Sequence, residues 1–174
     1  MDVCSLDWGA ISTIIGAGIA SATALYISRQ WRDQKGSEVI ANEAKSLFYD
    51  VCEHRKHIDY ILNYEVTKNG LIKAVVGIEN LIITINDKIS FLYENINNKD
   101  RKDSLDFYKK SINNLNEYIS KLVDEKEYEN INDLVKEIQQ GLEINLDKPD
   151  SYFTNYKISL IKVKENLINI STYK

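Results

Sequence analysis

Hydrophobic positions recur along most of the chain at alternating spacings of three and four residues, a period typical of helices that pack in bundles. Four apolar seams follow this rule, over residues 40–61, 71–96, 105–122 and 153–170. A shorter series between 131 and 142 indicates one further, short helix. There is no strand signal and no internal repeat. The pattern therefore predicts an all-α fold, an antiparallel helical bundle of four to five helices.

Breaks between the seams predict where the chain turns. The segments "KNG" at 68–70, "NNKD" at 97–100 and "DKPD" at 147–150 combine Gly, Asn, Asp and Pro, which favour turns. Gly36 and Ser37 allow two interpretations: a helix break with Ser37 as the N-cap, or only a weak point between the predicted span and the bundle. The bundle domain is predicted over 37–174.

The helix predicted over 71–96 carries a second apolar face beside its seam. This face comprises Ile72, Val76, Leu81, Ile83, Phe91 and Tyr93. Charged and amide side chains interrupt it, and such groups are costly in lipid, so the helix is not a membrane span. We expect a central helix that its neighbours bury on two sides; the alternative is that the second face contacts another subunit.

The N-terminal region breaks the pattern, because no charged residue occurs from Trp8 to Ser28. At about 1.5 Å per residue, these 21 residues cover roughly the 30 Å hydrocarbon thickness of a bilayer as a helix. A soluble core helix would normally carry a polar stripe. A cleaved signal would need a basic leader, which residues 1–7 lack. We therefore predict a transmembrane helix over 8–28.

Two kinds of residue flank this predicted span. Tryptophan and tyrosine prefer the headgroup level, and cations collect on the cytoplasmic side of a membrane. The predicted interface anchors are Trp8, Tyr26, Arg29, Trp31, Arg32 and Lys35. Residues 1–7 contain Asp2 and Asp7 but no cation. The charge difference predicts an extracytoplasmic N-terminus (1–7), a basic join (29–36) and a cytoplasmic bundle at the bacterial inner membrane.

Small side chains gather on one side of the predicted span. At about 100° per residue, one face carries Gly9, Ser12, Gly16, Ala20 and Thr23, and the other carries Ile11, Ile14 and Leu25. Helices associate in lipid through close backbone approach and hydroxyl contacts. We expect the lipid bilayer and further copies of the chain as partners, with the Ser12 and Thr23 hydroxyls lining any opening.

The sequence contains no Gly-rich phosphate loop and no CxxC, HExxH or GxSxG motif. The only histidines, His54 and His57, lie with Asp50 in "DVCEHRKHID", at spacings that share a helical face. Such a face can hold a metal ion or a proton-shuttling pair. We favour the alternative, in which His54 packs in the apolar seam and His57 pairs with a neighbouring acid. No enzyme activity, cofactor or metal is expected.

The charge of the chain bears on nucleic-acid binding, and its two cysteines bear on disulfide formation. The chain has 22 basic and 26 acidic residues, and the part after the predicted span keeps a charge near −2. It lacks the basic field that nucleic acids require, so no nucleic-acid partner is expected. The predicted topology separates the two cysteines. Cys52 should be a reduced, buried thiol, and Cys4 is either unpaired or bonded to another chain.

The uncharged stretch "GAISTIIGAGIASATALYIS", the basic "RQWR" and the helical bundle together resemble small membrane effectors of bacterial anti-phage defence. One such group is the pore-forming accessory protein of some RNA-targeting CRISPR systems. That group has a helical domain of the HEPN type, in which four to six residues separate an Arg from a His. Arg55 and His57 have one residue between them, so the resemblance implies membrane assembly without RNA cleavage.

Two functional hypotheses follow from these observations. In the first, the chain is a membrane effector that clusters through its span and forms a pore or a membrane-perturbing assembly. In the second, the span is only an anchor, and the bundle recruits a protein partner as a membrane-tethered interaction module.

Overall fold

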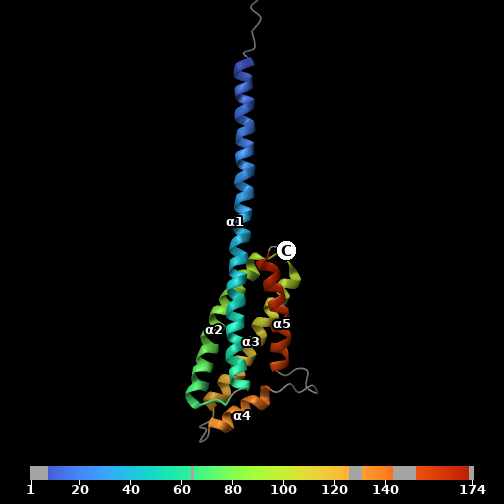
Figure 1. Ribbon diagram of the computed structural model, residues 1–174. Helices are drawn as coiled ribbons and strands as arrows, with labels where there is room; N and C mark the ends of the chain where they lie inside the picture. Colours follow the sequence, from blue (N-terminus) through green and yellow to red (C-terminus); the bar gives the residue numbers. More distant parts are fainter. Residues whose placement is uncertain (1–7, 64, 126–130, 143–151, 173–174) are drawn as a thin grey trace, which may run out of the picture. The chain divides into compact units, whose positions relative to one another are not determined.

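The computed structural model describes residues 8–63, 65–125, 131–142 and 152–172, without the side chains at 8–12, 14, 124–125, 131 and 141–142. These residues form five helices and no strand (Figure 1). The helices are α1 (Trp8–Asn63), α2 (Lys68–Asn95), α3 (Lys99–Glu125), α4 (Ile131–Leu142) and α5 (Tyr152–Ser171). The predicted all-α fold and the short helix α4 are both confirmed. The chain divides into two units, residues 1–39 and 40–174.

The second unit is a four-helix bundle. The C-terminal part of α1 and helices α2, α3 and α5 run alternately down and up, and α4 lies at one end (Figure 1). Helix α3 packs against α2, α4 and α5. The four predicted seams form most of the core: every seam residue is buried except Ile40 and Leu122, which are half-buried. The spacing of three and four residues was therefore sufficient to identify most of the core.

The expectation that α2 is buried on two sides is wrong. Most of its second apolar face is exposed, and only one member, Leu81, is half-buried. The exposed members are Ile72, Val76, Ile83, Phe91 and Tyr93. Helix α3, whose sequence is more polar than that of α2, packs against α2, α4 and α5. A helix's apolar content therefore did not decide its place in the bundle.

The turn between α1 and α2 lies slightly before its predicted position. Thr67 is the N-cap of α2, and its hydroxyl accepts a hydrogen bond from the Gly70 amide at 3.2 Å. Because this bond satisfies a free amide of the first turn, "KNG" at 68–70 is already helical. The turn predicted at 97–100 is confirmed, since α2 ends at Asn95 and α3 begins at Lys99. The turn predicted at 147–150 lies outside the described residues.

Helix α1 continues through Gly36 without a break. The Ser37 hydroxyl donates to the Asp33 carbonyl oxygen at 2.9 Å, one helical turn earlier, so Ser37 is not an N-cap. The interpretation as a helix break with Ser37 as the N-cap is therefore wrong. A single interior glycine costs only about 1 kcal/mol of helix stability, which a helix of 56 residues tolerates.

The first unit contains the N-terminal part of α1. All its described side chains, at position 13 and over 15–39, are exposed, including Ile19, Leu25 and Trp31. Among the side chains that the structure describes, no helix offers a stretch both long and apolar enough for a membrane crossing.

A polar cluster joins α1 to α2 inside the bundle. The Lys88 ammonium donates to the Asp50 carboxylate at 2.5 Å and to the Ser46 hydroxyl at 2.7 Å. The Lys88 and Asp50 side chains are only 19% and 23% exposed, so water screens their charges weakly. A part-buried pair of this kind fixes the alignment of two helices, because any slip leaves a desolvated charge without a partner.

Two glycines of α2 allow aromatic rings of α1 to approach closely. A Cβ atom at Gly77 would lie 2.8 Å from the His57 ring, and one at Gly70 would overlap the Tyr60 hydroxyl. Both glycines lie seven residues apart on the side of α2 that faces α1. The side chains of α1 therefore lie directly on the α2 backbone at these two levels.

Helix α4 closes the end of the bundle through one amide side chain and an apolar face. The Gln139 amide donates to the Ile61 carbonyl oxygen at 3.0 Å, one of the last carbonyls of α1, which have no partner within their own helix. Leu134, Val135 and Ile138 belong to the common core. The short helix thus both caps α1 and covers the apolar end of the bundle.

The polar cluster between α1 and α2 can be tested with a double-mutant cycle. We expect Lys88→Met to lower the free energy of unfolding by about 1–3 kcal/mol, because Asp50 is left part-buried without its partner. Lys88→Met combined with Asp50→Leu should cost less than the sum of the two single changes. Urea denaturation of all four proteins measures the coupling. Strictly additive losses would show that the pair does not contribute as a unit.

Candidate functional site

The first candidate site is the small-residue face of the predicted span. The backbone of α1 is helical from Trp8 onward, so the spacing of Gly9, Ser12, Gly16, Ala20 and Thr23 places them on one side of the helix. A Cβ atom added at Gly16 would meet no heavy atom within 4 Å. The side chains at positions 8 and 12 lie outside the described set.

Hydroxyl groups in this region bond to their own helix. Thr23 Oγ1 donates to the Ile19 carbonyl oxygen at 2.9 Å, and Ser21 Oγ donates to the Ala17 carbonyl oxygen at 2.8 Å. A hydroxyl satisfied in this way removes most of the cost of placing Ser or Thr in an apolar medium. The Thr23 hydroxyl is therefore less available to line an opening than the sequence suggested.

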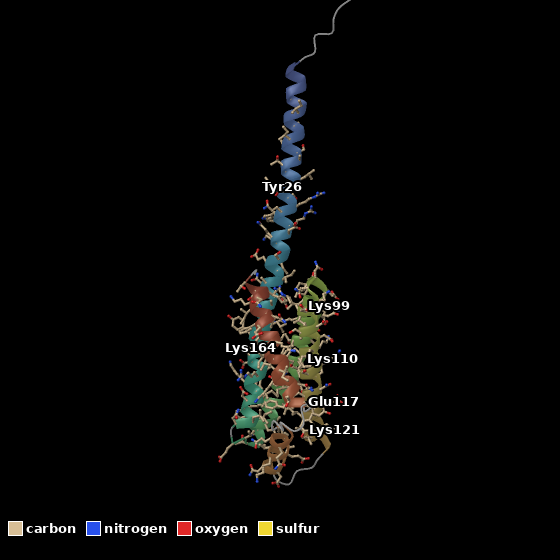
Figure 2. All side chains as sticks on the ribbon, turned by 90° about the vertical axis from the view of Figure 1, so that its right-hand side faces the viewer. Tyr26, Lys99, Lys110, Glu117, Lys121 and Lys164 are labelled. Carbon is tan, nitrogen blue, oxygen red and sulfur yellow. The ribbon has the colours of Figure 1, made fainter. Side chains whose placement is uncertain are left out.

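Aromatic and basic side chains follow the small-residue face. Tyr26 and Trp31 are exposed, and the Lys35 ammonium lies 5.2 Å from the centre of the Trp31 ring. A cation over an indole face one turn away is a weak attraction, about 0.5–1 kcal/mol at an exposed site. It groups a ring and a charge on one side of α1. Figure 2 shows Tyr26 on the N-terminal part of this helix.

The second candidate site is a buried polar cluster contributed by three helices. His54 of α1 is 1% exposed, and its Nδ1 lies 3.2 Å from the Tyr156 hydroxyl of α5. The Tyr156 ring lies 6.4 Å from the ring of Tyr108 of α3, centre to centre. The Tyr108 hydroxyl has no hydrogen-bond partner among the described residues. His54 is thus packed in the apolar seam, as we favoured.

Burial sets the ionisation of this cluster. It lowers the pKa of His54 to about 4, with a smaller contribution from the charge of His57. It also raises the pKa of Tyr108 well above its usual range, and the pKa of Tyr156 rises for the same reason. All three groups are therefore neutral near pH 7. A neutral imidazole and a neutral phenol form one hydrogen bond in a site closed to water, which favours packing over proton transfer.

The predicted His54–His57 face does not form one site, because its members point to different helices. Asp50 pairs with Lys88 of α2, and His57 lies against Gly77 of α2, whereas His54 faces α5. The predicted ion pair of His57 is not formed with any described residue. Among the described residues, no three His, Cys, Asp or Glu side chains lie close enough together to hold a metal ion.

Two further predictions concern the cysteines. Cys52 is a free thiol, as expected, but it is half-buried where full burial was predicted, because it lies at the edge of the α1 seam and not within it. Cys4 lies outside the described residues.

An open cleft of about 900 Å³ lies where α1 ends, α2 begins and α4 crosses. Its charged lining residues are Glu65, Lys68 and Lys136, which carry both signs, and Val66 and Val135 supply apolar area. No sequence pattern predicted the cleft, because its walls come from the end of α1, the start of α2 and the length of α4, which only the fold brings together.

The contact between His54, Tyr108 and Tyr156 was missed from the sequence. Each residue was correctly placed on its own seam, but nothing in the spacing showed that the three lie at one level of the bundle. A signal was present, since each of the three seams carries one residue with a polar tip. Comparison with known protein families, with curated proteins and with solved structures finds no match.

The neutral state of buried His54 makes stability depend on pH. Unfolded histidine binds a proton below about pH 6.5, whereas folded His54 does so only near pH 4. The unfolded state therefore holds more protons in this window, and the free energy of unfolding falls as the pH falls. We expect His54 to contribute a loss of about 3 kcal/mol between pH 6.5 and 4.

The measurement compares urea denaturation of the wild type with that of His54→Leu across this pH range. The variant lacks the titrating group, whereas the carboxylates affect both proteins equally. The free energy of unfolding of the variant should therefore fall by about 3 kcal/mol less than that of the wild type between pH 6.5 and 4. Parallel curves would mean that His54 titrates in the folded protein as it does in water.

Proposed function

We propose that the chain is a single-pass membrane protein that self-associates through residues 8–28 and acts as a membrane effector. The observation that carries this proposal is the run of 21 uncharged residues from Trp8 to Ser28 within one helix. The run begins at Trp8. The side chains at 8–12 and 14 lie outside the described set, and the uncharged character of these positions follows from the sequence. Its length matches roughly the 30 Å that lipid requires.

Two features of α1 support this assignment. The hydroxyls of Ser21 and Thr23 are satisfied within the helix, as a lipid environment demands. The described side chains from 15 to 28 are exposed and uncharged, which is costly in water but favourable in lipid. The exposed face includes Ile15, Ile19 and Leu25.

The orientation follows from charge. Arg29, Arg32 and Lys35 follow the run, whereas Asp2 and Asp7 precede it. The positive-inside rule then assigns the bundle to the cytoplasm of a bacterial cell, with about seven residues outside. Tyr26 and Trp31 suit the headgroup level on the cytoplasmic side.

The effector activity is proposed from the small-residue face and from the resemblance to small membrane effectors of anti-phage defence. Gly16 and Ala20 permit close approach of neighbouring backbones, which is how spans cluster where lipid supplies no hydrophobic force between them. A cluster of spans perturbs the bilayer or encloses a pore. Controlled overexpression in bacteria tests this activity: an effector should collapse the membrane potential read by a voltage-sensitive dye.

The alternative proposal is a membrane-tethered interaction module. It is favoured by the exposed apolar residues that the bundle retains on α2 and α5, among them Ile83 and Ile161. Exposed aliphatic side chains on a folded domain are a common feature of surfaces that recruit a partner. A membrane potential that survives overexpression, with the protein still in the membrane fraction, would favour this alternative.

The proposed orientation predicts the behaviour of a reporter at the C-terminus. Alkaline phosphatase fused after Lys174 folds only outside the cytoplasm, so the fusion should be inactive, and a green fluorescent protein fusion should be bright. High phosphatase activity of an intact fusion would reverse the topology. Low activity with the protein in the soluble fraction would exclude the membrane assignment.

The small-residue face predicts a difference between two glycines. Gly16→Leu should reduce the oligomer seen in mild detergent, because a leucine side chain holds neighbouring backbones apart. Gly18→Leu, on the lipid side, serves as the matched control and should have little effect. Both positions have open space around them within the chain, so neither change disturbs the protomer.

Size-exclusion chromatography with light scattering measures this difference, and the membrane-potential assay should follow it. Equal oligomers for both variants and the wild type would show that the small-residue face is not the interface.

A further inference from the structure

The side of α2 that points away from the core carries a second regular series. Lys73, Val76, Asn80, Ile83 and Asp87 follow one another at spacings of three and four residues. All five are exposed, and the aliphatic members are 48% and 64% exposed. In Figure 1, α2 forms the left margin of the bundle, with α1 and α3 covering its other sides. We call these five residues the outer face of α2.

The residues of the outer face of α2 lie at nearly equal distances before and after Asn80. The pattern therefore nearly matches itself when the helix is turned to run in the opposite direction. Lys73 and Asp87 each lie seven residues from Asn80, which is about 10 Å along a helix. Val76 lies four residues before Asn80, and Ile83 lies three after it. Reversal therefore places a cation at the level of an anion and one aliphatic side chain at the level of another.

We propose that a second copy of the chain binds this outer face, with the two α2 helices antiparallel across a two-fold axis at Asn80. In such an isologous contact every pair occurs twice. Lys73 meets the partner subunit's Asp87, Val76 packs beside the partner's Ile83, and the two Asn80 amides face each other on the axis. An amide offers both a donor and an acceptor, so Asn80 can bond to its own copy.

The charges on the outer face are available for this contact. Within the described part of the chain, neither Lys73 nor Asp87 makes an ion pair, whereas the adjacent Lys88 is held by Asp50. Glu79, on the flank of the face, accepts instead from Ser120 of α3. The two charges that reversal brings together are thus those that the fold leaves unused.

The exposed apolar stripe on α5 lacks such a pair of opposite charges without partners. It consists of Ile158, Ile161 and Ile168. The charged residues of α5 are Lys157, Lys162, Lys164 and Glu165. The lysines lie over aromatic rings of their own chain, and the Lys164 ammonium is 5.3 Å from the centre of the Phe48 ring. Figure 2 shows Lys164 on the bundle. A two-fold contact there would bring lysines together, so α2 is the better self-association face.

The contact should be weak in dilute solution. A stable dimer usually buries about 800 Å² on each partner, and one helix face of about four turns supplies less. Holding the copies at high local concentration strengthens such a contact without changing it. The high local concentration rests on the proposed membrane function, whereas the contact between the two α2 helices does not.

Cysteine cross-linking tests the axis directly. Asn80→Cys in a full-length chain that also carries Cys4→Ser and Cys52→Ser should give a disulfide-linked dimer on mild oxidation, because only a residue near the axis approaches its own copy. Ile161→Cys, which is also exposed but lies on α5, is the matched control and should remain monomeric. Cross-linking of Ile161→Cys, or none at Asn80→Cys, would overturn the proposal.

Charge reversal provides the second arm. Lys73→Asp in the Asn80→Cys background should lower the dimer yield about tenfold, since like charges then face each other. Lys73→Asp combined with Asp87→Lys should restore it, because the reversed pairs are again complementary. No rescue would show that the two residues do not meet. Gly16→Leu leaves this readout intact, so failure of the span interface and failure of the α2 interface can be told apart.

Discussion

The bundle depends on the mutual burial of four apolar seams. Each seam is covered only if its helix lies against two others, and α3 meets this condition against α2, α4 and α5 together. Hydrophobic burial contributes roughly 25 cal/mol for each Å² removed from water, which makes this the dominant favourable term. The polar contacts are built around it: Lys88 with Asp50 and Gln139 with the end of α1 select one alignment among several that bury similar area.

Helix α1 has two parts whose side chains differ in burial. Over residues 40–63 it contributes a seam to the core, while its described side chains before 40 are all exposed. The change occurs without a break, because Gly36 and Ser37 remain helical. A continuous helix satisfies its own backbone hydrogen bonds in water and in lipid alike. The same secondary structure therefore suits the bundle and the proposed span.

The exposed faces of the molecule carry its proposed interactions, whereas its buried polar groups serve stability. His54 and Tyr156 are closed to water and neutral, and the proposals for function rest instead on the small-residue face of α1 and on the outer face of α2. These two faces have different chemistry. Small residues suit contact in lipid, and complementary charges with aliphatic side chains suit contact in water.

The sequence alone determined the helical class and the four seams, and it favoured the short helix α4 and the packed state of His54, because all of these follow from local periodicity. The tertiary structure decided what periodicity cannot encode, which is the neighbour that each face meets. It left Ile83 exposed although α2 is more apolar than α3, and it separated His57 from His54. The physical reason is that spacing fixes which residues share a face of one helix, whereas burial is decided by the helices that pack around it.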